Sequence, residues 1–374
     1  MSAGVYLHIP FCKSRCSYCD FATDVYRDSG GVERYVDAIC REVEEPPEGG
    51  TLNSVDTVYF GGGTPSLLDA NQVEKILAAV HGRFDVTPDA EITMEMNPAT
   101  VSAETLRYYR VLGVNRASFG VQTFDDRALK LLARGHDADD ARNTFKLLRE
   151  AGFENISFDL IAGLPNQTLE NWERNLDEAL AMQPEHLSLY LLEIHQATPL
   201  AEQIRSKRQP LPDEDLAAEM YEMMLERTSV AGFEQYEISN FSRAGFASRH
   251  NTKYWRLDPV YSFGVSAHSF DGVQRYANER DTAKYVSLID EKGSAETMRE
   301  TIDAASEFIF LGLRLNRGID LKEYEERFGI DLIQRYGDEI DRLIGYGLID
   351  QSDRTIKLTE KGMLFSNEVF AVFV

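Results

Sequence analysis

The chain has 374 residues, which is enough for one large domain and a smaller one. Its 39 basic and 62 acidic side chains give a formal net charge of −23, and such a surface repels phosphate backbones and anionic membranes. No apolar run approaches the roughly 20 residues needed to span a bilayer. The first residues lack the basic flank of a signal peptide, so we expect a cytoplasmic chain whose thiols stay reduced.

Strand-like and helix-like segments alternate along the first part of the chain. The sequence predicts strands at 5–9, 55–60, 90–96, 114–120, 155–161 and 186–192. It predicts helices at 32–44, 70–81, 102–112, 126–151 with a break near Gly135, 168–182 and 213–231. This repetition predicts an α/β fold with a parallel sheet, and six units fit an incomplete (β/α)6 barrel better than a closed eight-fold one. A doubly wound open sheet is the alternative.

Polar and glycine-rich turns follow these predicted strands. Cysteines and the turn Gly61–Gly63 come after the first two strands, and Asn97, Gln122 and Gly163 come after later ones. Ligands gather at the carboxyl ends of the strands in both architectures. We therefore expect one active site at that end of the sheet.

The pattern changes after about residue 236. We expect a core domain at 1–236, an aromatic, loop-rich connecting segment at 237–297 and a smaller, mostly helical domain at 298–374. The connecting segment contains the stretch RHNTKYWR.

Residues 347–362 predict a short hairpin between helices, which makes the C-terminal domain winged-helix-like. A winged helix often binds DNA, but here Arg354, Lys357 and Lys361 are balanced by nearby acidic residues. We therefore expect no nucleic-acid partner and favour a packing or lid role.

Three cysteines lie close together in the stretch YLHIPFCKSRCSYCDF: Cys12, Cys16 and Cys19, with the spacing C-x3-C-x2-C. Zinc usually takes four ligands in two separated pairs, and His8 is the residue that would close such a site here. Cys40 lies within a predicted helix, where burial as a small apolar residue is favoured. An iron–sulfur cubane fits the triplet better than zinc, because three thiolates bind three irons and leave the fourth iron open.

The triplet, with Tyr18 before its last cysteine, resembles the signature of radical S-adenosylmethionine (SAM) enzymes. The resemblance implies a [4Fe–4S] cluster on Cys12, Cys16 and Cys19, with SAM bound at the open iron. In that family, an electron from the cluster cleaves SAM to a 5′-deoxyadenosyl radical.

Further motifs, in order along the chain, resemble the SAM-binding residues of this family. The turn in VYFGGGTPS resembles its GGTP motif, which contacts the methionine amino group. The residues implied to bind SAM are Tyr6, Tyr18, Gly62, Gly63, Thr64, Glu95, Gln122, Arg134 and Asp159. Taken singly, several of these are equally well explained as ordinary polar or core residues. His8 shares a strand face with Tyr6, and the resemblance implies that it adjusts the electrostatics of the cluster.

Over almost the whole chain, motifs such as GVQTF, LARGH, DLIAGLPNQT and GVSAHSF resemble oxygen-independent coproporphyrinogen III dehydrogenase and its relatives. The dehydrogenase itself decarboxylates propionates to vinyls in heme biosynthesis. A second branch, the HemW-type heme chaperones, keeps the cluster motif but binds heme and passes it to acceptor proteins. Two departures favour the chaperone branch: Phe21 stands where the dehydrogenase usually has a further cysteine, and the cluster begins at residue 12, without a longer N-terminal arm.

The stretch HNTKYW resembles a motif of the heme chaperones and implies heme binding at His250, Asn251, Tyr254 and Trp255. Imidazole ligates heme iron, and aromatic rings cover the apolar macrocycle. The alternative makes His250 a hydrogen-bonding core residue and Trp255 an anchor between domains. His268 is a weaker candidate for a heme-proximal or structural role.

The resemblance leaves the chemistry of the functional cycle open. A chaperone without dehydrogenase activity is favoured, and the dehydrogenase is the alternative. The expected partners are heme and an unidentified acceptor protein, with membrane contact only through a partner and with a homodimer left open.

Overall fold

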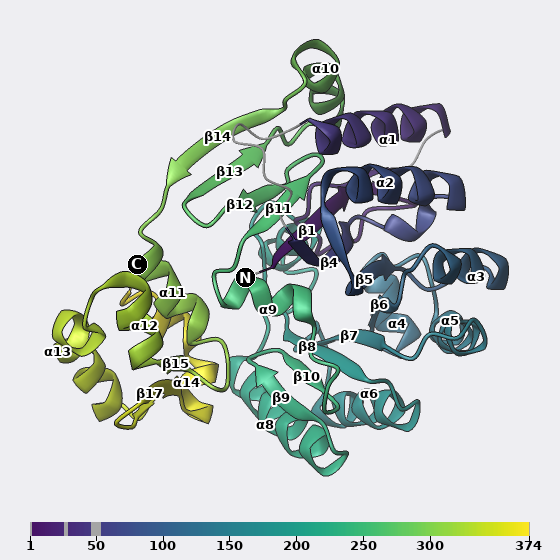
Figure 1. Cartoon of the computed structure of the whole chain (residues 1–374). Coiled ribbons are helices and arrows are strands. Elements are labelled where there is room, and N and C mark those ends of the chain that lie inside the picture. Colours follow the sequence, from purple (N-terminus) through teal and green to yellow (C-terminus); the bar gives the residue numbers. More distant parts are fainter. Residues whose placement is uncertain (1, 26–28, 46–53, 374) are drawn as a thin grey trace.

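A single twelve-stranded sheet organises most of the molecule (Figure 1). The structure is a computed structural model, and it describes residues 2–25, 29–45 and 54–373. Six strands lie parallel and side by side in chain order: β1 (Ala3–Ile9), β4 (Ser54–Gly62), β5 (Asp85–Met96), β6 (Arg116–Gln122), β7 (Ile156–Ala162) and β8 (His186–Leu191).

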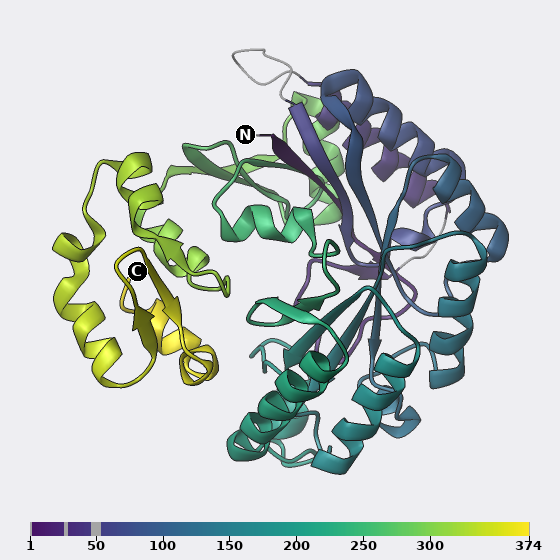
Figure 2. The ribbon, with the colours of Figure 1, turned by 60° about the horizontal axis from the view of Figure 1, so that its bottom comes forward.

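Helices follow these strands along one side of the sheet, as Figure 2 shows. They are α1 (Ser29–Glu44), α2 (Ala70–Arg83), α3 (Ala103–Val111), α4 (Asp126–Leu131), α5 (Ala138–Glu150), α6 (Leu169–Ala181), α7 (Pro199–Arg205) and α8 (Glu214–Val230). A doubly wound sheet reverses its strand order and carries helices on both faces. The sequential strand order and one-sided helices therefore confirm the incomplete (β/α)6 barrel.

The helix ends follow capping rules, and this explains the predicted break near Gly135. Helix α4 ends before Ala133, whose φ of 55° is left-handed. Asp137 then caps α5 by accepting a hydrogen bond from the Asp140 backbone N–H, while the Asp140 side chain accepts from the backbone N–H of Asp137. One predicted segment is therefore two helices.

Strand residues alternate between an apolar outer face and a polar inner face. The outer residues pack against the helices; Phe60, Phe119 and Phe158, for example, have no exposed surface. The inner positions of the six parallel strands include Thr57, Tyr59, Glu91, Thr93, Glu95, Arg116, Ser118, Ser157, Asp159, His186 and Ser188. The apolar core therefore lies between sheet and helices, and the inside of the partial barrel is available for polar chemistry.

The connecting segment continues the sheet, so the expectation of a loop-rich stretch was wrong. Strand β11 (Val260–Phe263) pairs parallel with β1, and β12 (His268–Phe270), β13 (Gln274–Asn278) and β14 (Glu296–Thr301) follow antiparallel. At the opposite edge, β10 (Asn240–Ser242) and β9 (Glu234–Glu237) extend the sheet beyond β8. Helices α9 (Arg249–Trp255) and α10 (Thr282–Lys292) lie between these strands in sequence. The strands are short, and β14 is largely exposed, so they lack the apolar alternation that marks a strand in sequence.

The C-terminal domain has the predicted helix–hairpin–helix pattern. Its helices are α11 (Ala304–Gly312), α12 (Leu321–Phe328), α13 (Leu332–Gly345), α14 (Glu360–Leu364) and α15 (Ser366–Phe370). Its small sheet has the order β15 (Ile319–Asp320), β17 (Thr355–Leu358), β16 (Ile349–Gln351). A second apolar core centred on Phe308 and Ile356 fills this domain and reaches back to Ile238, Leu257 and Phe270. The boundaries 1–236, 237–297 and 298–374 stay a prediction. In the described part of the chain, no helix has the length and apolar character to cross a membrane.

Candidate cofactor site

The cysteine triplet lies on a loop that starts at the carboxyl end of β1. Two short parallel strands, β2 (Phe11–Cys12) and β3 (Asp24–Val25), close the base of this loop. The thiols of Cys12, Cys16 and Cys19 are free and half-buried. Cys40 is buried within α1, as the sequence predicts.

A chain of hydrogen bonds joins the cysteine loop to the ends of the neighbouring strands. Thr64 Oγ1 donates to Cys12 Sγ over 3.6 Å, and Asn97 Nδ2 donates to Thr64 Oγ1 over 2.8 Å. Arg134 Nη2 donates to Asn97 Oδ1 over 2.7 Å, and Arg134 Nη1 lies 3.5 Å from Cys16 Sγ. Donor groups of Thr64 and Arg134 therefore lie against Cys12 and Cys16, and they tie the cysteine loop to the ends of β4 and β5.

The loop forms one wall of a cavity of about 440 Å³, a size typical of small-molecule sites. The cavity is lined by predicted residues from both the cluster set and the SAM set, namely Cys12, Cys16, Cys19, Tyr18, Gly62, Gly63, Glu95, Gln122, Arg134 and Asp159. Thr64 lies behind Cys12 and is 2% exposed. The structure therefore brings these residues together at the carboxyl ends of the strands, where the sequence predicts the site.

Gly62 and Gly63 lie where no side chain fits. Gly62 has a φ of 108°, and a Cβ atom built there would lie 2.6 Å from the His8 ring. A Cβ on Gly63 would lie 2.6 Å from the Pro10 carbonyl oxygen. Glycine therefore lets the backbone pass close beside the cysteine loop.

The thiols fit a cluster better than a single zinc ion. Within the described residues, no group of three or more histidine, cysteine or acidic side chains converges at single-ion distance. His8 is engaged elsewhere, since Nδ1 is hydrogen-bonded to the Tyr6 hydroxyl at 3.1 Å and Nε2 to the Ala22 carbonyl at 2.9 Å. A cubane puts each thiolate on a different iron, so its ligands need not meet at one point. Burial raises the pKa of the Cys12 thiol to about 11, so metal loading must displace a proton.

Two carboxylates face the cavity from the inner face of the sheet. Burial raises the pKa of Glu95 to about 7, although its oxygens accept hydrogen bonds from the Tyr59 hydroxyl at 2.7 Å and the Gly62 N–H at 3.1 Å. Burial also raises the pKa of Asp159, which Ser118 contacts at 3.5 Å. Buried carboxyl groups of this kind suit recognition of a cation, because a positive ligand favours their ionised form.

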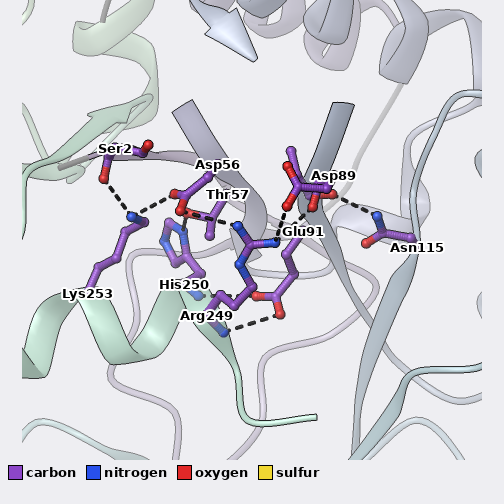
Figure 3. Close-up of polar contacts among 10 residues, drawn as sticks. Ser2, Asp56, Thr57, Asp89, Glu91, Asn115, Arg249, His250 and Lys253 are labelled. Carbon is purple, nitrogen blue, oxygen red and sulfur yellow. Dashed lines mark hydrogen bonds and ion pairs between the residues drawn. The ribbon is translucent and has the colours of Figure 1, made fainter. Parts of the chain in front are cut away.

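The HNTKYW residues lie elsewhere, on helix α9 near the N-terminal ends of β1, β4 and β5 (Figure 3). Lys253 Nζ pairs with Asp56 Oδ1 and donates to the Ser2 carbonyl, each at 2.7 Å. Arg249 pairs with Asp56 at 3.2 Å, and Glu91 accepts the backbone N–H groups of Arg249 and His250. These contacts fix α9 against the barrel at the end opposite the cysteine loop.

His250 has the surroundings of a core residue. It is 1% exposed, and its ring stacks on Tyr59 with 4.9 Å between centroids. Nδ1 is hydrogen-bonded to Thr57 Oγ1 at 2.9 Å, and Nε2 to the Tyr254 hydroxyl at 3.1 Å. Burial lowers the pKa of His250 to about 3, so the ring is neutral. In this fold neither nitrogen is free for iron, which matches the core alternative; heme ligation by His250 stays a prediction that this arrangement disfavours.

Of the other motif residues, Trp255 contacts Arg314 after α11, and Asn251 lies in the first turn of α9. The Arg314 guanidinium stacks on Trp255, 4.3 Å from the ring centroid, and pairs with the fully buried Glu237 at 3.1 Å. Trp255 therefore has the contacts of an anchor between domains. Asn251 donates its backbone N–H to the Ser248 hydroxyl, the N-cap of α9.

Residues that the resemblance did not assign to the cluster or to SAM also line the cavity, among them Asn97, which the sequence already placed after a predicted strand. Asn97 links Thr64 to Arg134 and lines the cavity, and its position after β5 was the available signal. Tyr190 and His195 also line the cavity, near the end of β8, and no motif marks them. Of the expected turn residues, Gly163 lies instead beside α8, donating its backbone N–H to Met220 Sδ over 3.3 Å.

Sequence comparisons agree with this geometry. The Radical SAM superfamily model matches residues 6–179, and the HemN C-terminal domain model matches residues 300–365. The heme chaperone HemW of Bacillus subtilis is 37% identical, over 99% of this chain and 99% of the relative. The heme chaperone HemW of Escherichia coli is 32% identical, over 99% of this chain and 98% of the relative.

Among solved structures, the coproporphyrinogen III oxidase HemN of Escherichia coli, a radical SAM enzyme, superposes with a TM-score of 0.86. The alignment covers 100% of this chain and 90% of the other, at 24% sequence identity, so it establishes the fold alone. The fold, both family models and the full-length similarity to heme chaperones agree: the chain belongs to the HemW family of radical SAM proteins.

Proposed function

We propose that the chain is a heme chaperone that carries a [4Fe–4S] cluster on Cys12, Cys16 and Cys19 and binds SAM beside it. Loaded with heme, it passes the heme to an acceptor protein. The full-length similarity to heme chaperones is the observation that carries this proposal.

The cavity at the carboxyl ends of the strands supports the cofactor part of the proposal. A [4Fe–4S] cluster, when bound, supplies one electron and an open iron for the amino and carboxylate groups of SAM. The chain's own residues orient the cofactor: Glu95 and Asp159 offer carboxylates to a cation, and the glycine turn at Gly62 allows close backbone approach.

One departure from the dehydrogenase pattern also supports the chaperone. Phe21 lines the cavity at the position of the extra cysteine and is 68% exposed. An aromatic ring at this place offers no ligand or hydrogen donor to a porphyrinogen.

The test uses anaerobic, cluster-reconstituted protein in two parallel assays. Titration with hemin, followed by Soret absorbance, should saturate near one heme per chain. Incubation with coproporphyrinogen III, SAM and a reductant should give no vinyl product. Turnover with release of methionine and 5′-deoxyadenosine, together with no saturable hemin binding, would establish the dehydrogenase instead.

A further inference from the structure

Asn97 stands between the two residues whose side chains donate toward the cysteine sulfurs. It follows β5, and its amide is hydrogen-bonded to Thr64 Oγ1 at 2.8 Å and to Arg134 Nη2 at 2.7 Å. Thr64 Oγ1 lies 3.6 Å from Cys12 Sγ, and Arg134 Nη1 lies 3.5 Å from Cys16 Sγ. One amide therefore connects the surroundings of two of the three cysteines.

The direction of the Asn97 amide follows from the hydrogen bonds that its two partners can make. A guanidinium only donates, so the amide oxygen Oδ1 must face Arg134 and the NH2 group must face Thr64. The Thr64 hydroxyl then accepts from Asn97, and its one proton remains for Cys12 Sγ. The amide of Asn97 therefore determines that Thr64 acts as a donor to sulfur.

The turn after β5 holds Asn97 in this position. The hydroxyl and the backbone N–H of Thr100 both donate to the Asn97 carbonyl oxygen, at 2.6 and 3.2 Å, and Ala99 within the turn has a left-handed φ of 60°. Lys13, in the cysteine loop, donates from Nζ to the Ala99 carbonyl oxygen over 3.4 Å. The turn and the cysteine loop are thus joined a second time, and Thr64 is 2% exposed. These surroundings limit the positions that the amide can take.

We propose that Asn97 is a positioning residue for the cluster: its amide keeps Thr64 and Arg134 as hydrogen-bond donors to the ligating sulfurs, and this raises the reduction potential of the cluster. The inference rests on the proposed function and deepens it, because it names a residue that controls the electron the cluster supplies. Reduction adds one electron, and therefore one negative charge, to the cluster and its thiolates. Donor groups at the sulfurs stabilise that charge, so the cluster is reduced at a higher potential. The electron comes from an external reductant, and no covalent bond of the protein changes.

Asn97→Asp tests the proposal with almost no change of shape. Aspartate keeps an acceptor for Arg134 but offers no donor to Thr64, so the Thr64 hydroxyl should turn to the new carboxylate and leave Cys12. The midpoint potential is measured on anaerobically reconstituted full-length protein without SAM, by following the EPR signal of the reduced cluster during titration with dithionite. The ratio of reduced to oxidised cluster at a given potential should fall about tenfold, which corresponds to a midpoint lower by about 59 mV.

Asn166→Asp is the matched control for the added charge. Asn166 lies in an exposed turn after β7, where its side chain donates to Gln209 over 3.2 Å. This variant gains the same charge as Asn97→Asp, away from Thr64, and it should keep the midpoint potential of the wild type. Iron and sulfide analysis of every variant ensures that four-iron clusters are compared.

A double-mutant cycle separates the effect of the hydroxyl from the effect of the charge. Thr64→Val removes the hydroxyl without adding charge, so it should lower the midpoint potential in the wild-type background. In the Asn97→Asp background it should change the potential little, because the hydroxyl has already turned away from Cys12. Additive shifts of the two substitutions, or an unchanged potential in Thr64→Val, would overturn the role of Asn97 while the proposed function stands. If the wild-type protein assembles no four-iron cluster, the proposed function is overturned and this inference falls with it.

Discussion

Replacing Glu95 by glutamine should stabilise the cofactor-free protein at neutral and alkaline pH. The pKa of Glu95 is raised from 4.5 to about 7, first by burial and then by the charge of Asp159. Between these two values the folded protein holds a proton that the unfolded chain has lost. Stability therefore falls as pH rises from about 4.5 to 7 and stays low above that range.

The magnitude follows from the shift. One pKa unit corresponds to about 1.4 kcal/mol, so 4.5 to about 7 gives about 3 kcal/mol, reduced to about 2 kcal/mol because the side chain borders an open cavity. Glutamine keeps the acceptor for the Tyr59 hydroxyl but turns an NH2 group toward the Gly62 N–H, which costs about 1 kcal/mol at every pH. That cost cancels when one variant is compared at two pH values.

Urea unfolding at pH 5 and pH 8, followed by tryptophan fluorescence, measures the effect. Trp172 is a suitable reporter, because it is fully buried in α6 and donates to the Met220 carbonyl. The free energy of unfolding of Glu95→Gln minus that of the wild type should be about 2 kcal/mol larger at pH 8 than at pH 5. An equal difference at both pH values would refute the raised pKa of Glu95.

Three further substitutions test separate parts of the structure. Cys16→Ser should abolish the iron–sulfur absorbance after reconstitution, whereas Cys40→Ser, in the buried face of α1, should keep it; absorbance in the first variant would contradict the cluster assignment. Arg314→Met should lower the free energy of unfolding in urea by about 3 kcal/mol, because it leaves the buried Glu237 carboxylate without its cation. A loss below about 1 kcal/mol would count against a stabilising role for this ion pair. Gly62→Ala should weaken SAM binding by about tenfold in calorimetry, because it strains a φ of 108°; unchanged affinity would separate this turn from the SAM site.

The parallel strands and their helices could be predicted because their apolar side chains repeat with clear periods. β7 and β8, for example, occupy 156–162 and 186–191, close to the predicted 155–161 and 186–192. β14 could not be predicted in this way. Its sequence ETMRET is mostly exposed and has no apolar alternation, and the strand is held by main-chain pairing with β13.

The residues of the candidate sites also differ in whether local sequence or tertiary packing determines their surroundings. Cys12 and Gly62 belong to short sequence motifs, and these motifs were enough to predict a place in the cavity that both residues line. HNTKYW is also a local motif, but its surroundings depend on tertiary packing. His250 turns inward between Thr57 and Tyr254, and no spacing within the motif indicates that direction. His268, a weaker candidate in the sequence, is exposed on β12, and its heme-proximal or structural role stays a prediction.

A count of cluster iron and heme iron on one preparation tests most directly whether the chain carries a [4Fe–4S] cluster and heme together. Cluster-reconstituted protein is loaded with hemin under anaerobic conditions, freed of excess ligand, and analysed for non-heme iron, sulfide and heme. The account predicts about four non-heme irons and about one heme per chain at the same time, with the iron–sulfur absorbance unchanged by hemin. Loss of non-heme iron in proportion to the heme bound would show that both groups compete for the cysteine loop.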